Sequence, residues 1–179
     1  MHRIALAGVK HCGKSTIGRL IAAQQGGVFR DLDDLILELL PAGFTVRSWY
    51  REKGQEAFRR MEEEALSAYL NCSGNEPFLC LSLGGGTMEN PAARELLHAG
   101  GVPVIALDED ADVLYQRIRR GGLPPFLDTE DPEKTFRELY TRRSATLKEF
   151  CDLVVSIHGL PPREAAEKVI SQIRRAYGR

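Results

Sequence analysis

Residues 4–18 read IALAGVKHCGKSTIG, a short apolar run followed at once by a glycine-rich turn that ends in Gly-Lys-Ser. The segment from Gly8 to Ser15 matches the pattern G-x-x-x-x-G-K-[ST] in full. In that pattern the glycines let successive backbone N–H groups surround phosphate oxygens, and the following helix presents its positive end to the same anion. We therefore predict a strand, a phosphate-binding loop and a helix, in this order, with a nucleotide held by the loop.

The loop residues divide the work of holding the nucleotide. Lys14 is expected to reach the β and γ phosphates and to act in catalysis, and the Ser15 hydroxyl is expected to ligate Mg2+. A glycine turn that binds nothing is the alternative, but the strand before the motif and the helix after it favour a nucleotide site. The expected nucleotide-binding residues are Gly8, His11, Cys12, Gly13, Lys14, Ser15 and Thr16.

Length and charge limit the classes of protein that the rest of the chain allows. The 179 residues fit a single domain over 1–179, and the 43% hydrophobic content excludes a disordered chain. With 24 Lys plus Arg against 25 Asp plus Glu, the net charge is −1. No global field then draws the protein to nucleic acid or to an anionic membrane, so an anionic ligand needs a local site.

The cysteines and the start of the chain indicate a reducing compartment. Cys12, Cys72, Cys80 and Cys151 are too few and too scattered for a disulfide framework or a C-x-x-C metal site. MHRIALAGV runs straight into the phosphate loop without the features of a signal peptide, and no apolar run reaches the length of a membrane span. We expect a cytoplasmic protein.

Apolar runs alternate with helical patterns along the whole chain, which indicates βαβ units. The predicted strands are Ile4–Ala7, Gly27–Phe29, Phe78–Leu83, Val104–Leu107 and Leu153–Ser156. The predicted helices are Lys14–Ala23, Gly54–Tyr69, Pro91–His98, Ala111–Arg120, Pro132–Cys151 and Pro162–Tyr177. Because several strands are apolar throughout, we expect helices on both faces of a parallel sheet, an α/β/α arrangement of three layers.

Two carboxylates follow the second predicted strand, at the edge where open α/β sheets bind ligands. On an extended segment, Asp31 and Asp33 would point the same way, one toward a metal and one toward an acceptor hydroxyl. A helix N-cap with an acidic first turn is the alternative interpretation.

Four motifs in this order and spacing resemble the shikimate kinases: GVKHCGKSTIG, FRDLDDLI, FRRMEE and LSLGGG. The resemblance implies a P-loop kinase fold with strand order 2-3-1-4-5, a substrate-binding helical region at about 32–66 and a lid at about 117–131. It implies transfer of the γ-phosphoryl group of ATP, with Mg2+, to the 3-hydroxyl of shikimate. The implied partner is thus a small molecule, and we expect a monomer.

The resemblance also assigns residues to the acceptor side. Asp31 joins Ser15 toward Mg2+, and Asp33 binds the substrate hydroxyls and takes the proton. Arg59 grips the substrate carboxylate, and a guanidinium pairs well with a planar carboxylate on physical grounds alone. Arg143 matches a second carboxylate-binding arginine. The glycine run Gly84, Gly85 and Gly86 contacts the substrate, through the N–H of Gly85.

The lid region departs from the family pattern. Arg117 best matches the catalytic lid arginine, although Arg119 or Arg120 could substitute for it. Pro124 stands where the family has the arginine of R-P-L-L, and His11 replaces the middle glycine of the phosphate loop. Two alternatives therefore stay open: a kinase for another small hydroxy acid or a nucleotide, and a nucleotide-binding module without phosphoryl transfer.

Overall fold

A computed structural model of the chain describes residues 2–71, 77–124 and 127–178. Within these ranges the chain forms a parallel sheet of five strands in the order β2-β3-β1-β4-β5, which confirms the predicted fold. The strands are β1 (Arg3–Ala7), β2 (Val28–Asp31), β3 (Leu79–Ser82), β4 (Val104–Asp108) and β5 (Leu153–Ser156). The order reverses beside β1, so the segment that follows β1 emerges at the switch point where such sheets bind ligands.

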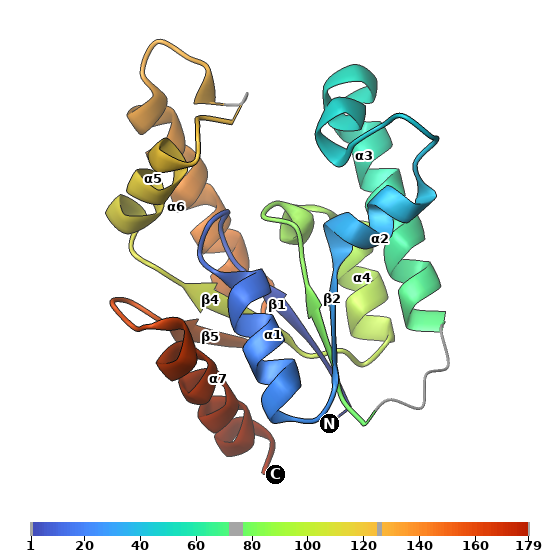
Figure 1. Ribbon diagram of the computed structural model, residues 1–179, viewed down its shortest axis with the longest axis vertical. Coiled ribbons are helices and arrows are strands. Elements are labelled where there is room, and N and C mark those ends of the chain that lie inside the picture. Colours follow the sequence, from blue (N-terminus) through green and yellow to red (C-terminus); the bar gives the residue numbers. More distant parts are fainter. Residues whose placement is uncertain (1, 72–76, 125–126, 179) are drawn as a thin grey trace.

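Helices cover both faces of the sheet (Figure 1). They are α1 (Lys14–Gln24), α2 (Leu32–Leu39), α3 (Val46–Asn71), η1 (Thr87–Glu89), α4 (Pro91–Ala99), α5 (Ala111–Arg120), α6 (Pro132–Phe150) and α7 (Pro162–Tyr177). The first and last helices, α1 and α7, pack side by side on one face, and α4 and α6 lie behind the sheet on the other. The expected three layers are therefore present. No described helix is long and apolar enough to cross a membrane.

The central strands form the core because both of their faces are covered. Ile4, Leu6, Leu81 and Ile105 have no exposed surface, and Leu6 pairs in register with Ile105 on the neighbouring strand. Burial of one such side chain stabilises the fold by about 1.5–3 kcal/mol. A rigid sheet thus supports the loops at its carboxyl edge.

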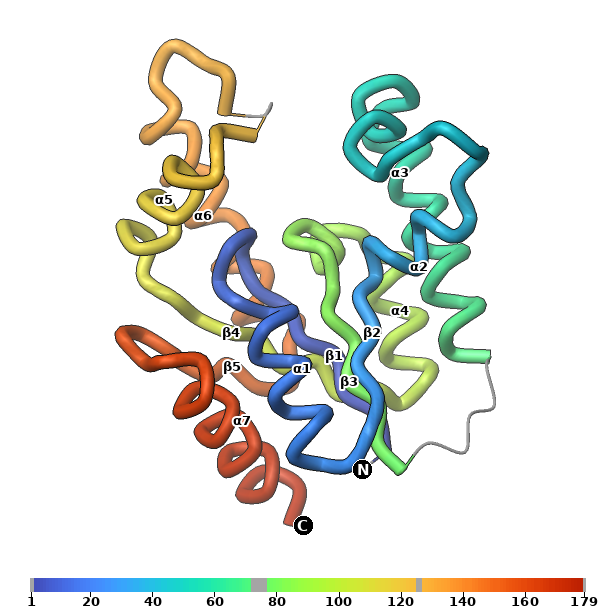
Figure 2. Tube along the Cα trace, in the orientation of Figure 1, coloured from blue at the N-terminus to red at the C-terminus, as the bar shows by residue number. Residues whose placement is uncertain are grey.

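Two arms rise beyond that edge on either side of the phosphate loop (Figures 1 and 2). The first arm contains α2 and the start of α3, and the second arm contains α5, the described residues that follow it and the start of α6. Residues 125 and 126, which belong to the predicted lid at about 117–131, lie outside the described residues. The arms bring segments that are far apart in sequence to the same end of the sheet.

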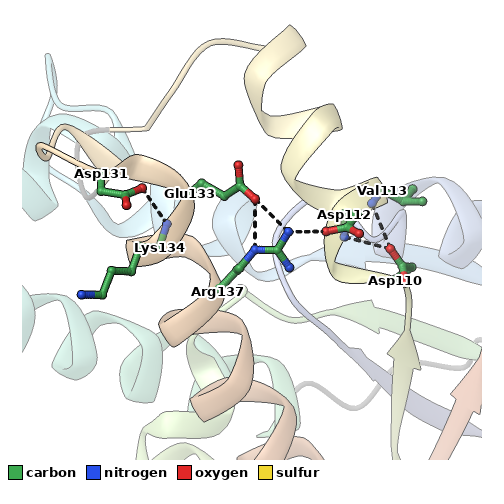
Figure 3. A network of polar contacts seen from close by, with 7 residues as sticks. All are labelled: Asp110, Asp112, Val113, Asp131, Glu133, Lys134 and Arg137. Carbon is green, nitrogen blue, oxygen red and sulfur yellow. Dashed lines mark hydrogen bonds and ion pairs between the residues drawn. The ribbon is translucent and has the colours of Figure 1, made fainter.

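Exposed ion pairs join the two helices of the second arm (Figure 3). The Arg137 guanidinium of α6 lies 2.6 Å from an Asp112 oxygen on α5 and 2.8 Å from Glu133 one turn earlier. The Asp110 carboxylate accepts hydrogen bonds from the backbone N–H groups of Asp112 and Val113 and so caps α5. Because the Arg137 pairs are open to solvent, their contribution to stability is small.

The first arm differs from the sequence prediction. The segment after β2, interpreted as extended, forms helix α2, and α3 begins at Val46 instead of Gly54. Thr45 and Ser48 exchange hydrogen bonds between side chain and backbone at 2.8 and 3.0 Å, an N-terminal cap that the sequence TVRS carried. Gly54, with φ 81°, interrupts α3 where the prediction had placed its start.

Candidate active site

The phosphate loop runs from Gly8 to Ser15 between β1 and α1. Gly8 and Gly13 have φ angles of 150° and 98°, which side chains rarely allow. A Cβ at Gly8 would lie 2.6 Å from the Cys12 sulfur and 2.9 Å from the Leu107 carbonyl oxygen. Both glycines are therefore required by the backbone path that exposes the loop N–H groups.

Lys14 points into the concave side of this loop. Its ammonium donates to the Gly8 carbonyl at 2.9 Å and to the Val9 carbonyl at 3.3 Å, and the residue is 9% exposed. The other predicted loop residues differ in access, because the Cys12 side chain is buried in the core while Thr16 is exposed on the first turn of α1. Lys14 thus carries the charge that the loop offers to a phosphate.

Ser15 and Asp31 meet at the start of α1, although 16 residues separate them. The Ser15 hydroxyl donates to the Asp31 carboxylate at 2.7 Å and lies 3.5 Å from the Ser82 hydroxyl. The meeting depends on β2, which continues to Asp31, beyond the predicted end at Phe29, and pairs Asp31 with Ser82. These hard oxygen donors suit Mg2+, which protein sites hold through one or two carboxylates together with substrate phosphates.

The described residues contain no group of three or more His, Cys, Asp or Glu side chains that could hold a metal ion. A Mg2+ ion at Ser15 and Asp31 therefore needs oxygens from the nucleotide to complete its shell. The donor set fits such a shared ion.

The extended arrangement expected for the two aspartates is wrong, and the alternative of a helix cap is confirmed. Asp31 caps α2, because its carboxylate accepts the N–H of Asp33 at 3.2 Å. Asp33 consequently lies in the first turn of the helix, with one carboxylate oxygen 3.7 Å from the Cβ position of Gly84. The capping side chain, not strand alternation, places both carboxylates at the edge of the sheet.

The surroundings of Asp33 favour its protonated form more than water does. The residue remains accessible to solvent, yet partial burial of its carboxyl, followed by the charge of Asp31, raises its pKa. Lys14 and Lys10 act in the opposite direction. A carboxylate with a raised pKa is a stronger base than an ordinary aspartate, which suits a proton acceptor.

The predicted glycine run follows β3 and makes room for an arginine from α6. A Cβ at Gly86 would lie 2.8 Å from one terminal nitrogen of Arg143, and a Cβ at Gly85 would lie 3.4 Å from the other. The Gly85 position is also 3.3 Å from the backbone nitrogen of Lys10. The glycine run therefore lies between the phosphate loop and the Arg143 guanidinium.

Glu89 holds Arg143 in place and was not predicted from the sequence. Its carboxylate accepts from the Arg143 Nε at 2.9 Å and from the Arg142 Nε at 2.7 Å. Burial disfavours the charge of Glu89, but the hydrogen bonds from the two arginines outweigh it and lower its pKa. Because Glu89 uses only the Nε of Arg143, both terminal nitrogens remain on the side of the glycine run.

Arg59 and Glu62, both from the motif FRRMEE, lie one turn apart on α3. The hydrogen-bond partners of Glu62 come from the segment after β3. The Glu62 carboxylate, 3% exposed, accepts from the Thr87 hydroxyl at 2.7 Å, and Asn90 also donates to it. Burial raises the pKa of Glu62, and the charge of Arg59 opposes that shift. Glu62 therefore fixes α3 to η1 beside the glycine run, and its effect on Arg59 is electrostatic.

Arg117, the predicted lid arginine, lies at the base of the second arm. Its guanidinium donates to the buried Glu109 carboxylate at 3.0 Å and to the His11 carbonyl in the phosphate loop at 3.2 Å. Arg119 and Arg120 occupy exposed positions in the last turn of α5. The structure thus brings Arg117 to the phosphate loop through a backbone contact.

Glu109 is the second polar residue that sequence reasoning missed. It directly follows β4 at the carboxyl edge of the sheet, the position where functional residues of such folds gather. That position is a signal that could have identified it. Glu89 offered no comparable signal, since its two arginines lie more than 50 residues away on α6.

Comparisons with known proteins show similarity to one family in sequence and in fold. The family model described as shikimate kinase matches residues 10–174. A shikimate kinase from Marinomonas sp. (strain MWYL1) is 31% identical over 172 residues, which cover 96% of this chain and 92% of that protein. One from Thermus thermophilus is 33% identical over 173 residues, with 96% and 90% covered. The structure of a shikimate kinase from Acinetobacter baumannii in complex with shikimate has a TM-score of 0.87 at 26% identity and covers 100% of this chain and 96% of that one.

Proposed function

The chain belongs to the shikimate kinase family, and from this premise we infer that it is an ATP-dependent kinase for shikimate. It transfers the γ-phosphoryl group of MgATP to the 3-hydroxyl of shikimate. The observation that carries the site assignment is the position of Arg143, whose terminal nitrogens lie against Gly85 and Gly86. The same glycine run also adjoins the phosphate loop, at Lys10, and the first turn of α2, at Asp33.

On the nucleotide side, the loop amides and Lys14 bind the phosphate oxygens. The Lys14 ammonium leaves its carbonyl partners and stabilises the charge that develops on the transferring group. Ser15 and Asp31 would hold Mg2+, which would supply positive charge to the nucleotide phosphates. Most of this catalysis is placement and electrostatics.

On the acceptor side, Arg143 and Arg59 bind the carboxylate and the N–H of Gly85 contacts the substrate. Asp33 orients the 3-hydroxyl and takes its proton as the hydroxyl oxygen bonds to the γ phosphorus and the bond from that phosphorus to the β-phosphate oxygen breaks. The raised pKa of Asp33 supports this role. Arg117 adds positive charge beside the loop from the base of the second arm.

The wider setting follows from the same proposal. The partner is a small hydroxy acid, and the protein acts as a monomer in the cytoplasm. The assignment to the cytoplasm rests on the few, scattered cysteines of the chain.

A coupled assay of ADP release tests the acceptor directly. Shikimate, gluconate and nucleoside monophosphates are each added to the protein with MgATP, and nucleotide binding is measured separately. Shikimate alone should stimulate ADP release. Stimulation by another acceptor would identify a different kinase, and ATP binding without any stimulation would identify a nucleotide-binding module.

A further inference from the structure

His11 has an unusual backbone conformation for its position in the phosphate loop. Its φ is 68°, and it is the one non-glycine residue with a positive φ in ranges 2–71, 77–124 and 127–178. A left-handed conformation is less favourable than the right-handed one for a residue with a side chain, because its Cβ approaches the following carbonyl oxygen. The loop therefore needs some other contact to hold His11 in this conformation.

Arg117 supplies that contact from a different part of the chain. One terminal nitrogen of its guanidinium donates to the His11 carbonyl oxygen at 3.2 Å, across 106 residues of sequence. A peptide carbonyl held by a charged donor resists rotation of the backbone on either side of it. Arg117 thus fixes the orientation of the peptide group that follows His11.

Glu109 in turn fixes Arg117. Its side chain is 2% exposed, and one carboxylate oxygen lies 3.0 Å from the second terminal nitrogen of Arg117. The other carboxylate oxygen accepts the N–H of Asp110 at 3.1 Å, and the Glu109 carbonyl accepts the Tyr140 hydroxyl at 3.1 Å. A buried carboxylate with these partners is a rigid anchor, because its unpaired charge would be costly.

The ring of His11 faces the end of α5. Its Cε1 atom lies 3.7 Å from the Cβ position of Gly121, which caps that helix. Burial, followed by the charges of Lys10, Lys14 and Arg117, lowers the pKa of His11. The shift favours the neutral imidazole, which does not repel the guanidinium that holds the His11 carbonyl.

We propose that Glu109 and Arg117 are positioning residues which hold His11 in its left-handed conformation and so shape the phosphate loop for the triphosphate. Arg117 then acts through the backbone of His11 and not by touching the transferring group. The proposal deepens the proposed function, on which it rests for the identity of the nucleotide. It explains how a histidine is tolerated in a loop conformation that glycine adopts freely.

Replacement of His11 by glycine distinguishes an Arg117 that holds the His11 backbone from an Arg117 that touches the transferring group. Glycine adopts a positive φ without help, so His11→Gly should remove the need for the Glu109–Arg117 pair. Arg117→Met and Glu109→Gln are each made with His11 and with glycine at position 11, and MgATP dissociation constants are measured. With His11 present, each variant is expected to weaken MgATP binding about 10-fold, and with glycine at position 11 less than about 3-fold. Double-mutant cycles resolve a coupling of this size.

Arg137→Met is the matched control, because Arg137 also pairs with carboxylates in the second arm, but its partners, Asp112 and Glu133, belong to α5 and α6 and not to the phosphate loop (Figure 3). It should leave binding unchanged in both backgrounds. If Arg117→Met or Glu109→Gln fails to fold with His11 present, the proposal requires that His11→Gly restores the melting temperature of that variant.

Equal losses with either residue at position 11 would overturn the proposal, as would a loss confined to kcat. Either result would mean that Arg117 does not act through the conformation of His11. Nucleotide binding needs no acceptor, so a failure of the shikimate assignment would leave this test intact.

Discussion

The phosphate side and the acceptor side of the site are built in opposite ways. The phosphate side is one continuous segment, Gly8–Ser15, in which Gly8 and Gly13 have positive φ angles and Lys14 binds back to the loop carbonyls. One contact from a distant segment, Arg117 with His11, supports it. The acceptor side combines α2, α3, the glycine run and α6, and depends on contacts such as Glu89 with Arg143 across 54 residues. A local motif thus fixes where the phosphates lie, whereas tertiary packing determines which alcohol lies beside them.

This difference predicts separable effects. Changes on the phosphate side should reduce turnover with any acceptor, and changes on the acceptor side should raise the acceptor KM and leave nucleotide binding intact.

The largest effect is expected at Lys14. Lys14→Met should lower kcat about 10³-fold, because the ammonium stabilises charge that develops in the transition state. The dissociation constant for MgATP, measured in parallel, should rise far less, since the loop amides still bind the phosphates. Near-normal turnover in this variant would show that Lys14 has no catalytic role.

Arg143 should give the next largest effect, confined to the acceptor. Loss of hydrogen bonds to a charged group costs about 1.5–3 kcal/mol, so Arg143→Met should raise the acceptor KM about 10- to 150-fold. Arg142→Met is the control, because Arg142 shares Glu89 but has a side chain that is 64% exposed. Equal effects of the two variants would place the carboxylate elsewhere.

A methyl group at Gly86 should have a smaller effect on the same contact. The added Cβ would lie 2.8 Å from an Arg143 nitrogen, and the flexible guanidinium can move away. Gly86→Ala should therefore raise the acceptor KM about 3- to 10-fold, because part of a charged hydrogen bond is lost. The melting temperature should be nearly unchanged. In the Arg143→Met background the same change should add nothing, and an additive effect would refute the contact.

The smallest effect concerns stability at low pH. The pKa of Glu89 is lowered in the folded protein, so its ionised form stabilises the fold above its ordinary value of 4.5, and this stability is lost as the pH falls through the lowered value. Urea unfolding at a series of pH values measures the free energy of unfolding. The value for wild type should exceed that for Glu89→Gln by a constant amount near neutrality, and the difference should shrink below about pH 4.5. A margin that is independent of pH would contradict the ion pairs.

The sequence was most informative where neighbours along the chain decide the structure. The motif predicted the phosphate loop, and the apolar runs predicted the five strands. The family resemblance then implied the strand order that the sheet has. Helix α2 was only the alternative interpretation of its segment, because an aspartate that caps a helix and an aspartate on an extended segment look alike in sequence.

The supports of the arginines could not be predicted in the same way. Glu89 meets Arg143, and Glu109 meets Arg117, only after helices from distant segments pack on the sheet. No periodicity or spacing records such a contact. The residues that bind a ligand were therefore easier to identify than the residues that hold them in place.

The most direct test of the account compares shikimate with its carboxamide, which keeps the 3-hydroxyl and lacks the negative charge. For wild type, kcat/KM should be about 100-fold higher with shikimate than with the carboxamide, because the carboxamide lacks the charged hydrogen bond to Arg143. Arg143→Met should lose most of that preference. If the variant kept the full preference, or if wild type had none, the acceptor carboxylate would not lie at Arg143.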